Sequence, residues 1–69
     1  MNTDVLQGKW KQVRGEVKRL WGKLTDDDLQ EVEGDYEKLV GKVQARYGYN
    51  REKIQQELDN LCRAAETRD

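Results

Sequence analysis

The sequence predicts an all-α fold, a small bundle of four or five short helices in a single domain that spans residues 1–69. Two observations support this prediction. Apolar residues recur at steps of three and four, which places them on one face of a helix. In addition, residues 8–22 and 34–48 share one pattern, which indicates a duplicated helical unit. The periodic apolar residues indicate that the chain folds. Because 39% of the residues are charged and only 35% are hydrophobic, we expect the folded domain to have modest stability.

The internal repeat is visible when GKWKQVRGEVKRLWG (residues 8–22) is placed above GDYEKLVGKVQARYG (residues 34–48). At an offset of 26 residues, three glycines and two aromatic residues align. Each copy carries one apolar stripe, and the stripes consist of Leu6, Trp10, Val13, Val17, Leu20 and Leu24, and of Val32, Tyr36, Leu39 and Val43. The stripes are expected to form the core. The aromatic residues Trp21 and Tyr47 lie beside them and could cover the edge of the core or contact a partner.

Capping residues and glycines mark the ends of the helices. Thr25 precedes Asp28 by three residues, as in a capping box, and Asn50 is placed to cap the last helix. We expect Gly22 and Gly48 to end helices in the left-handed conformation. These signals predict helices near residues 3–7, 9–21, 26–33, 35–47 and 51–65.

The other four glycines are expected to have two different roles. Gly8 and Gly34 are interpreted as breaks between a short helix and a long one. Gly15 and Gly41 fall inside predicted helices, where glycine costs about 1 kcal/mol relative to alanine. Their missing side chains could allow close packing against another element or could leave a bare groove for a ligand or partner. Close packing is the interpretation that we favour.

Two stretches, WKQVRGEVKRLWGKLTDDDL and EGDYEKLVGKVQARYGY, together resemble the CsbD-like family of small bacterial proteins. The resemblance covers residues 8–49. It implies an all-helical fold in which two helical hairpins pack crosswise, similar to SAM-like domains. It also implies a part in the general stress response, and it supplies no catalytic residues.

Basic residues are concentrated in the first copy of the repeat. Residues 9–23 contain six basic residues and one acid, whereas residues 25–37 contain seven acids and no base. The basic side chains flank the glycine side of the helix, so this face could admit a phosphate backbone. Trp21 could stack on a base if it were exposed. The candidate face for nucleic acid or another partner consists of Lys9, Lys11, Arg14, Lys18, Arg19 and Trp21. There are two other interpretations: these bases simply solvate the helix, or the acidic segment pairs with the basic one within the fold.

Several kinds of chemistry find little support in the sequence. There is no histidine, and the lone Cys62 cannot form an internal disulfide or a cysteine-rich zinc site. Cys62 is interpreted as a small buried residue or a half-exposed thiol. The cluster from Thr25 to Asp28 could hold a divalent cation, but a capped helix start explains it better. We expect no catalytic residues, no metal and no cofactor.

The resemblance to CsbD-like proteins, together with the highly charged composition, favours a non-enzymatic stress-response protein with a protective or interaction role. The alternative function is a nucleic-acid-associated module that uses residues 9–23. Partners could be proteins or nucleic acid. No apolar run is long enough to span a membrane, so we expect a soluble cytoplasmic protein. We also expect a monomer.

Overall fold

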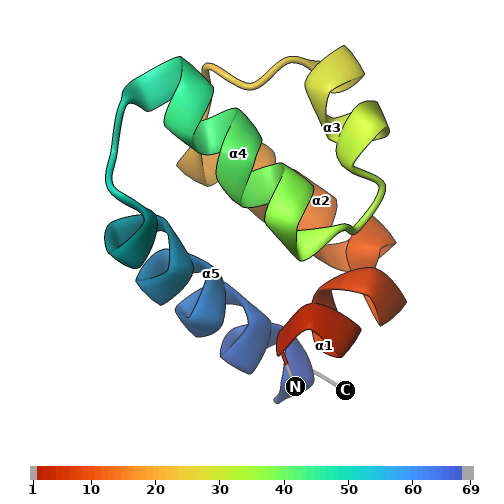
Figure 1. Ribbon diagram of the computed structural model, residues 1–69. Coiled ribbons are helices and arrows are strands. Elements are labelled where there is room, and N and C mark those ends of the chain that lie inside the picture. Colours follow the sequence, from red (N-terminus) through yellow and green to blue (C-terminus); the bar gives the residue numbers. More distant parts are fainter. Residues whose placement is uncertain (1, 68–69) are drawn as a thin grey trace.

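The computed structural model describes residues 2–67, which form five α-helices and no strand (Figure 1). The helices are α1 (Asn2–Gly8), α2 (Trp10–Leu20), α3 (Asp26–Val32), α4 (Tyr36–Tyr47) and α5 (Arg51–Glu66). All five predicted helices are confirmed, and each end lies within one residue of its predicted position.

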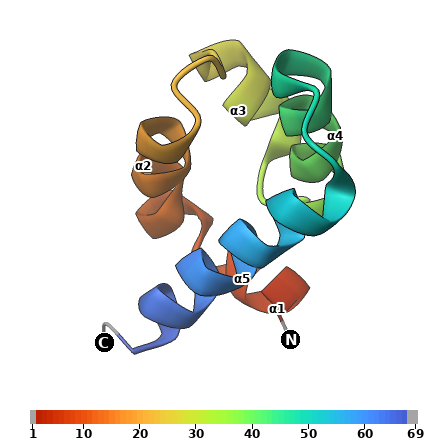
Figure 2. The same cartoon turned by 90° about the vertical axis from the view of Figure 1, so that its left-hand side faces the viewer.

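The last helix organises the others. α5 packs against α1, α2 and α4, while α3 packs on α4. In Figure 2, α2 and α4 stand apart, with α3 at one end of the pair and α5 crossing near the other. The core fills the space that these helices enclose. Its buried members are Leu6, Val13, Val17, Trp21, Leu24, Leu29, Val32, Tyr36, Leu39, Val40, Val43, Ile54, Leu58, Cys62 and Ala65.

The predicted apolar stripes are confirmed with two corrections. Leu20 was expected in the core, but its side chain is 44% exposed. Trp21, which follows Val17 by one helical turn, takes the buried position at the end of α2 and leaves Leu20 at the edge beside α5. Trp10 is only partly buried and packs against the outside of the core.

The helix ends follow the predicted capping residues. The Thr25 hydroxyl accepts a hydrogen bond from the Asp28 backbone N–H at 3.1 Å, and the Asp28 carboxylate accepts one from the Thr25 backbone N–H at 3.1 Å. The Asn50 side chain caps α5 in the predicted way. Gly48 ends α4 in the left-handed region with φ of 74°.

The prediction for Gly22 is wrong, because only Gly34 and Gly48 among the described glycines have positive φ. α2 ends one residue earlier instead. The Trp21 backbone N–H donates to the Val17 carbonyl at 2.8 Å, and Trp21 leaves the helical conformation with φ of −122° and ψ of 78°. Burial of the Trp21 ring therefore sets the end of this helix.

The prediction that Gly15 and Gly41 allow close packing against another element is also wrong. A methyl group added at either position would meet no atom within 4 Å, and both residues are exposed. The close approach occurs at Gly34, between α3 and α4, where an added Cβ would lie 3.1 Å from Gln7 Cα of α1. Gly34 also has φ of +84°, which L-residues rarely adopt. Gly15 and Gly41 thus lie on open faces, and Gly34 is the glycine that packs closely against another helix.

Alanine substitutions are expected to raise the free energy of unfolding at Gly15 and Gly41 and to lower it at Gly34. Gly15→Ala and Gly41→Ala should each stabilise the protein by up to about 1 kcal/mol, because helix propensity improves without a clash. Gly34→Ala should destabilise it by about 1–3 kcal/mol, because of backbone strain and contact with α1. Urea unfolding followed by circular dichroism measures all three. Destabilisation by Gly15→Ala would show that another element does pack on this face.

Candidate functional site

A small basic face lies on the outside of α2. Lys11, Arg14 and Lys18 line a shallow hollow beside Gly15, and α3 closes one side of the hollow with Asp26 and Leu29. Lys11 and Arg14 are exposed, and within residues 2–67 neither has a carboxylate partner within 4 Å. Because Gly15 has no side chain, the backbone of α2 is accessible between these basic groups.

Of the other predicted bases, Lys18 lies in the hollow, whereas Lys9 and Arg19 lie outside it. Lys18 belongs to the hollow but pairs with Asp26, with Nζ and Oδ1 2.9 Å apart. Lys9 is half-buried, and its Nζ donates to the Ala65 carbonyl of α5 at 3.1 Å. Arg19 lies beside Leu20, at the edge between α2 and α5. The structure therefore brings together three of the five predicted bases.

Trp21 cannot serve as the predicted stacking surface, because its side chain is only 2% exposed and lies in the core. The exposed aromatic pair is elsewhere. Tyr47 at the end of α4 stacks on Tyr49, with ring centroids 5.0 Å apart and 17° between the ring planes. Tyr49 was not among the residues predicted for the candidate face. Its position between two helices, with a lysine on the following turn, is a signal that could have been used.

Three of the four acidic residues of α3, Asp26, Asp28 and Glu31, pair with basic side chains of α2 and α4. The Arg46 guanidinium donates to both carboxylate oxygens of Asp28, at 3.1 and 3.0 Å. Lys42 pairs with Glu31 and approaches Asp28 at 3.6 Å. Asp28 is buried, so this network fastens α3 to α4 from within. The hydrogen bonds from Arg46 and then from the Thr25 backbone hold the pKa of Asp28 well below its usual range.

Asp28 is expected to make the protein sensitive to acid. The unfolded chain takes up a proton near the ordinary pKa of 3.8, whereas the folded protein does so only at lower pH. The free energy of unfolding should therefore fall as the pH drops below about 4. In Asp28→Asn this part of the pH dependence should disappear, while the exposed control Asp27→Asn should keep it. Thermal unfolding measured from pH 7 to pH 2 tests this, and equal acid sensitivity in both variants would argue against the buried pair.

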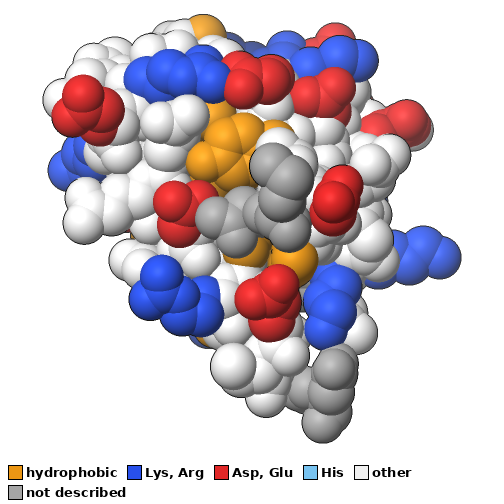
Figure 3. Space-filling view, turned by 60° about the horizontal axis from the view of Figure 1, so that its bottom comes forward, with side chains coloured by type: hydrophobic (Ala, Val, Ile, Leu, Met, Phe, Trp, Pro, Cys, Tyr) orange, Lys and Arg blue, Asp and Glu red, His pale blue; other side chains and the backbone are white. Residues whose placement is uncertain are grey.

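Acidic and basic side chains are interspersed on the surface (Figure 3). On the face shown in Figure 3, acidic and basic side chains surround a small apolar area. Leu20 and Tyr49 are the exposed large hydrophobic residues of the described part of the chain. Within that part, every buried side-chain nitrogen or oxygen has a hydrogen-bond partner.

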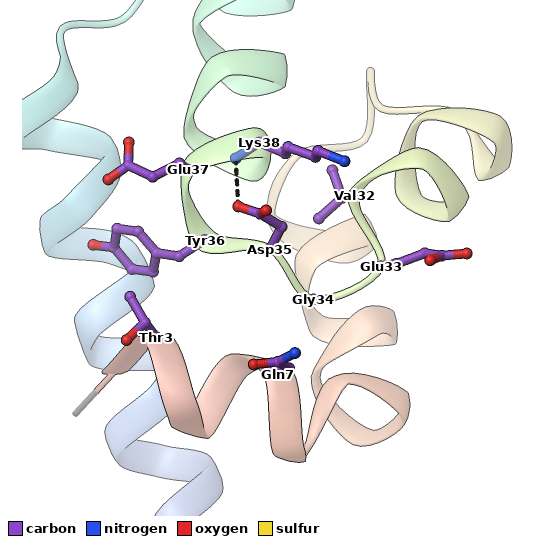
Figure 4. Close-up of a pocket in the computed structure, with 9 residues that line it drawn as sticks. All are labelled: Thr3, Gln7, Val32, Glu33, Gly34, Asp35, Tyr36, Glu37 and Lys38. Carbon is purple, nitrogen blue, oxygen red and sulfur yellow. Dashed lines mark hydrogen bonds between the residues drawn. The ribbon is translucent and has the colours of Figure 1, made fainter.

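A hollow also lies between α1 and the start of α4 (Figure 4). Thr3 and Gln7 of α1 line one side, and the segment from Val32 to Lys38 lines the other. The Asp35 side chain already has a partner within the protein, because it caps α4 by accepting a hydrogen bond from the Lys38 backbone N–H at 3.1 Å. The remaining walls combine carboxylates, an amide and a tyrosine ring.

The remaining candidate groups are buried or paired. Cys62 is fully buried, which confirms its interpretation as a small core residue, and burial raises the pKa of its thiol. Burial likewise raises the pKa of Tyr36 to about 12, and its hydroxyl donates to Asp59 at 3.4 Å. Among the described residues, no three histidine, cysteine or acidic side chains lie together in a way that could hold a metal ion. Likewise, no helix in residues 2–67 has the length and apolar character needed to cross a membrane.

These features define a small all-helical protein whose candidate functional groups lie on charged surface faces. The chain belongs to the CsbD-like family, because the family model described as CsbD-like matches residues 4–56. The match extends beyond the residues that carry the resemblance in the sequence and includes the start of α5.

Relatives in several bacteria are similar over most of their length. The chain is 57% identical over 58 residues to the UPF0337 protein PA4738 of Pseudomonas aeruginosa, which covers 84% of this chain and 89% of that protein. It is 52% identical over 58 residues to the UPF0337 protein YjbJ of Escherichia coli K12, covering 84% of each. No solved structure matches the chain significantly. The molecular function of this family is uncharacterised.

Proposed function

We propose that the protein acts without catalysis, as a protective or interacting component of a bacterial stress response. The observation that supports this most directly is the surface. Charged side chains make up 39% of the sequence, while most of the described apolar residues are buried in the core and only two large ones, Leu20 and Tyr49, are exposed. Such a surface binds water strongly and resists self-association through apolar patches.

The charges are also arranged so that the surface stays mixed in sign. Lys18 pairs with Asp26, and Arg51 of α5 pairs with Glu37 of α4 at 2.5 Å. Exposed ion pairs of this kind contribute little to stability and are screened by salt. Because the core is apolar and closed, the fold does not depend on these pairs. The domain is therefore expected to remain folded when the salt concentration rises.

A drying experiment tests the protective role. An unrelated, desiccation-sensitive enzyme is dried with the purified protein or with an inert protein of equal mass, and its activity is measured after rehydration. We expect more activity to survive in the presence of the CsbD-like protein. Equal losses in the two samples would contradict a protective role.

A second candidate function, association with nucleic acid, is favoured by the hollow on α2. Lys11 and Arg14 are exposed beside the bare backbone at Gly15, so phosphate groups could approach them closely. Lys18 completes the basic lining and would exchange its pairing with Asp26 for a phosphate.

Salt-dependent binding tests this second function. Fluorescence anisotropy with labelled oligonucleotides should show affinity that falls steeply with salt, and Lys11→Glu should weaken binding and lower the salt slope by about one or more. Lys38→Glu is the matched control, because this exposed lysine lies on α4 and outside the hollow. Equal weakening by both variants would indicate a net-charge effect and would argue against the α2 face.

A further inference from the structure

We propose that Tyr49, supported by Tyr47 and flanked by Lys23 and Lys53, is a stacking site for a base of a single-stranded nucleic acid. This inference rests on the second candidate function and identifies its ligand as single-stranded. It also supplies the aromatic group that the buried Trp21 cannot provide.

The site gathers residues from four parts of the chain. Tyr47 ends α4, Tyr49 lies in the segment that leads into α5, and Lys53 lies in the first turns of α5. Lys23 lies in the segment between α2 and α3. The Lys23 Nζ lies 5.0 Å from the centroid of the Tyr47 ring, and the Lys53 Nζ lies 4.6 Å from that of Tyr49. Two stacked rings are thus accompanied by two ammonium groups.

The inner ring is fixed, while the outer ring is accessible. The Tyr47 hydroxyl accepts a hydrogen bond from the Lys23 backbone N–H at 3.0 Å, and its ring packs against the core. Tyr49 stacks on this fixed ring and is 36% exposed. An aromatic surface that is already oriented loses little freedom on binding, which favours recognition of a planar group.

Relative strengths indicate that a base would displace the lysine from the Tyr49 ring. An exposed contact between a cation and an aromatic ring shifts an equilibrium by only about two- to fivefold. Stacking of a base on an aromatic side chain is worth about 5- to 150-fold. The displaced Lys53 ammonium would then be free to contact a phosphate of the same strand. The Tyr49 ring would gain a base as its partner, and Lys53 would gain a phosphate.

Single-stranded rather than duplex nucleic acid fits this arrangement. A base must leave its neighbours to lie on a tyrosine ring, and an unpaired strand can do this at little cost. Lys23 ends the basic stretch that begins on α2, so the same segment connects the tyrosine pair with the basic face. A strand contacting both surfaces would combine stacking with phosphate binding.

The test is a titration of isotope-labelled protein with oligothymidylate and oligouridylate of about twelve nucleotides, within the length that single-strand sites cover. A duplex of equal length is titrated in parallel. We expect upfield shifts of the Tyr49 ring protons with single strands. Tyr49→Leu should weaken binding by about 5- to 150-fold, whereas Tyr49→Phe should retain it. Circular dichroism confirms that both variants are folded. The tighter of the two single strands identifies DNA or RNA as the source.

Unchanged Tyr49 ring signals, with equal affinity of wild type and Tyr49→Leu, would overturn the stacking site. If Lys11→Glu still weakened binding in that case, the α2 face would stand as the nucleic-acid surface without it. Absence of binding by any oligonucleotide would overturn both. Duplex binding as tight as single-strand binding, and equally insensitive to Tyr49→Leu, would also contradict the inference.

Discussion

Replacement of Trp21 by alanine is expected to lower the free energy of unfolding by about 3–5 kcal/mol, as is typical when a buried aromatic side chain is lost from a core. A domain of 69 residues has a total stability of about 3–10 kcal/mol, at typical values per residue. The variant should therefore be close to unfolded at 37 °C. Thermal and urea unfolding followed by circular dichroism measure the loss.

Trp10 provides the matched control for this prediction. Trp10 is the first residue of α2, and Trp21 directly follows the last. Trp10 is only partly buried, whereas Trp21 is almost completely buried. Trp10→Ala should therefore cost clearly less than Trp21→Ala. A loss below about 1 kcal/mol for Trp21→Ala would place this ring outside the core and would reopen the possibility that it stacks on a ligand.

Leu58→Ala is expected to lower the free energy of unfolding by about 2–5 kcal/mol. Leu58 is fully buried on α5, the helix that packs against α1, α2 and α4. A cavity at this position therefore loosens several helix contacts at once. The exposed neighbour Asn60 on the same helix is the control, and Asn60→Ala should change stability by less than about 0.5 kcal/mol. Equal effects at the two positions would contradict the central place of α5 in the fold.

Local features of the fold could be predicted from the sequence because local interactions determine them. The caps at Thr25 and Asn50, and the step of three or four between apolar residues, depend on neighbours within one helical turn. The same information does not say what lies across from a helix. The spacing of Gly15 was therefore compatible with packing as well as with an open face, and the structure shows the open face.

The candidate site depended even more on contacts between distant segments. The sequence showed that Lys9 is basic, but the contact that draws it to Ala65 of α5 comes from the folded chain. Similarly, Trp21 and Tyr47 occupy equivalent places in the repeat, yet one is buried and the other stacks with Tyr49 near the surface. The duplication itself and the crosswise arrangement of hairpins stay predictions.

We propose that the charged surface of the folded protein carries its function. The most direct test compares wild type with a variant in which four exposed charges are neutralised in balanced pairs, so that the net charge stays at −1. The substitutions are Lys11→Gln, Arg14→Gln, Glu33→Gln and Glu52→Gln, all at exposed positions. Both proteins are added to the same enzyme during drying, after circular dichroism has confirmed equal helicity and stability. The account predicts that the variant protects less than wild type, and equal protection would contradict it.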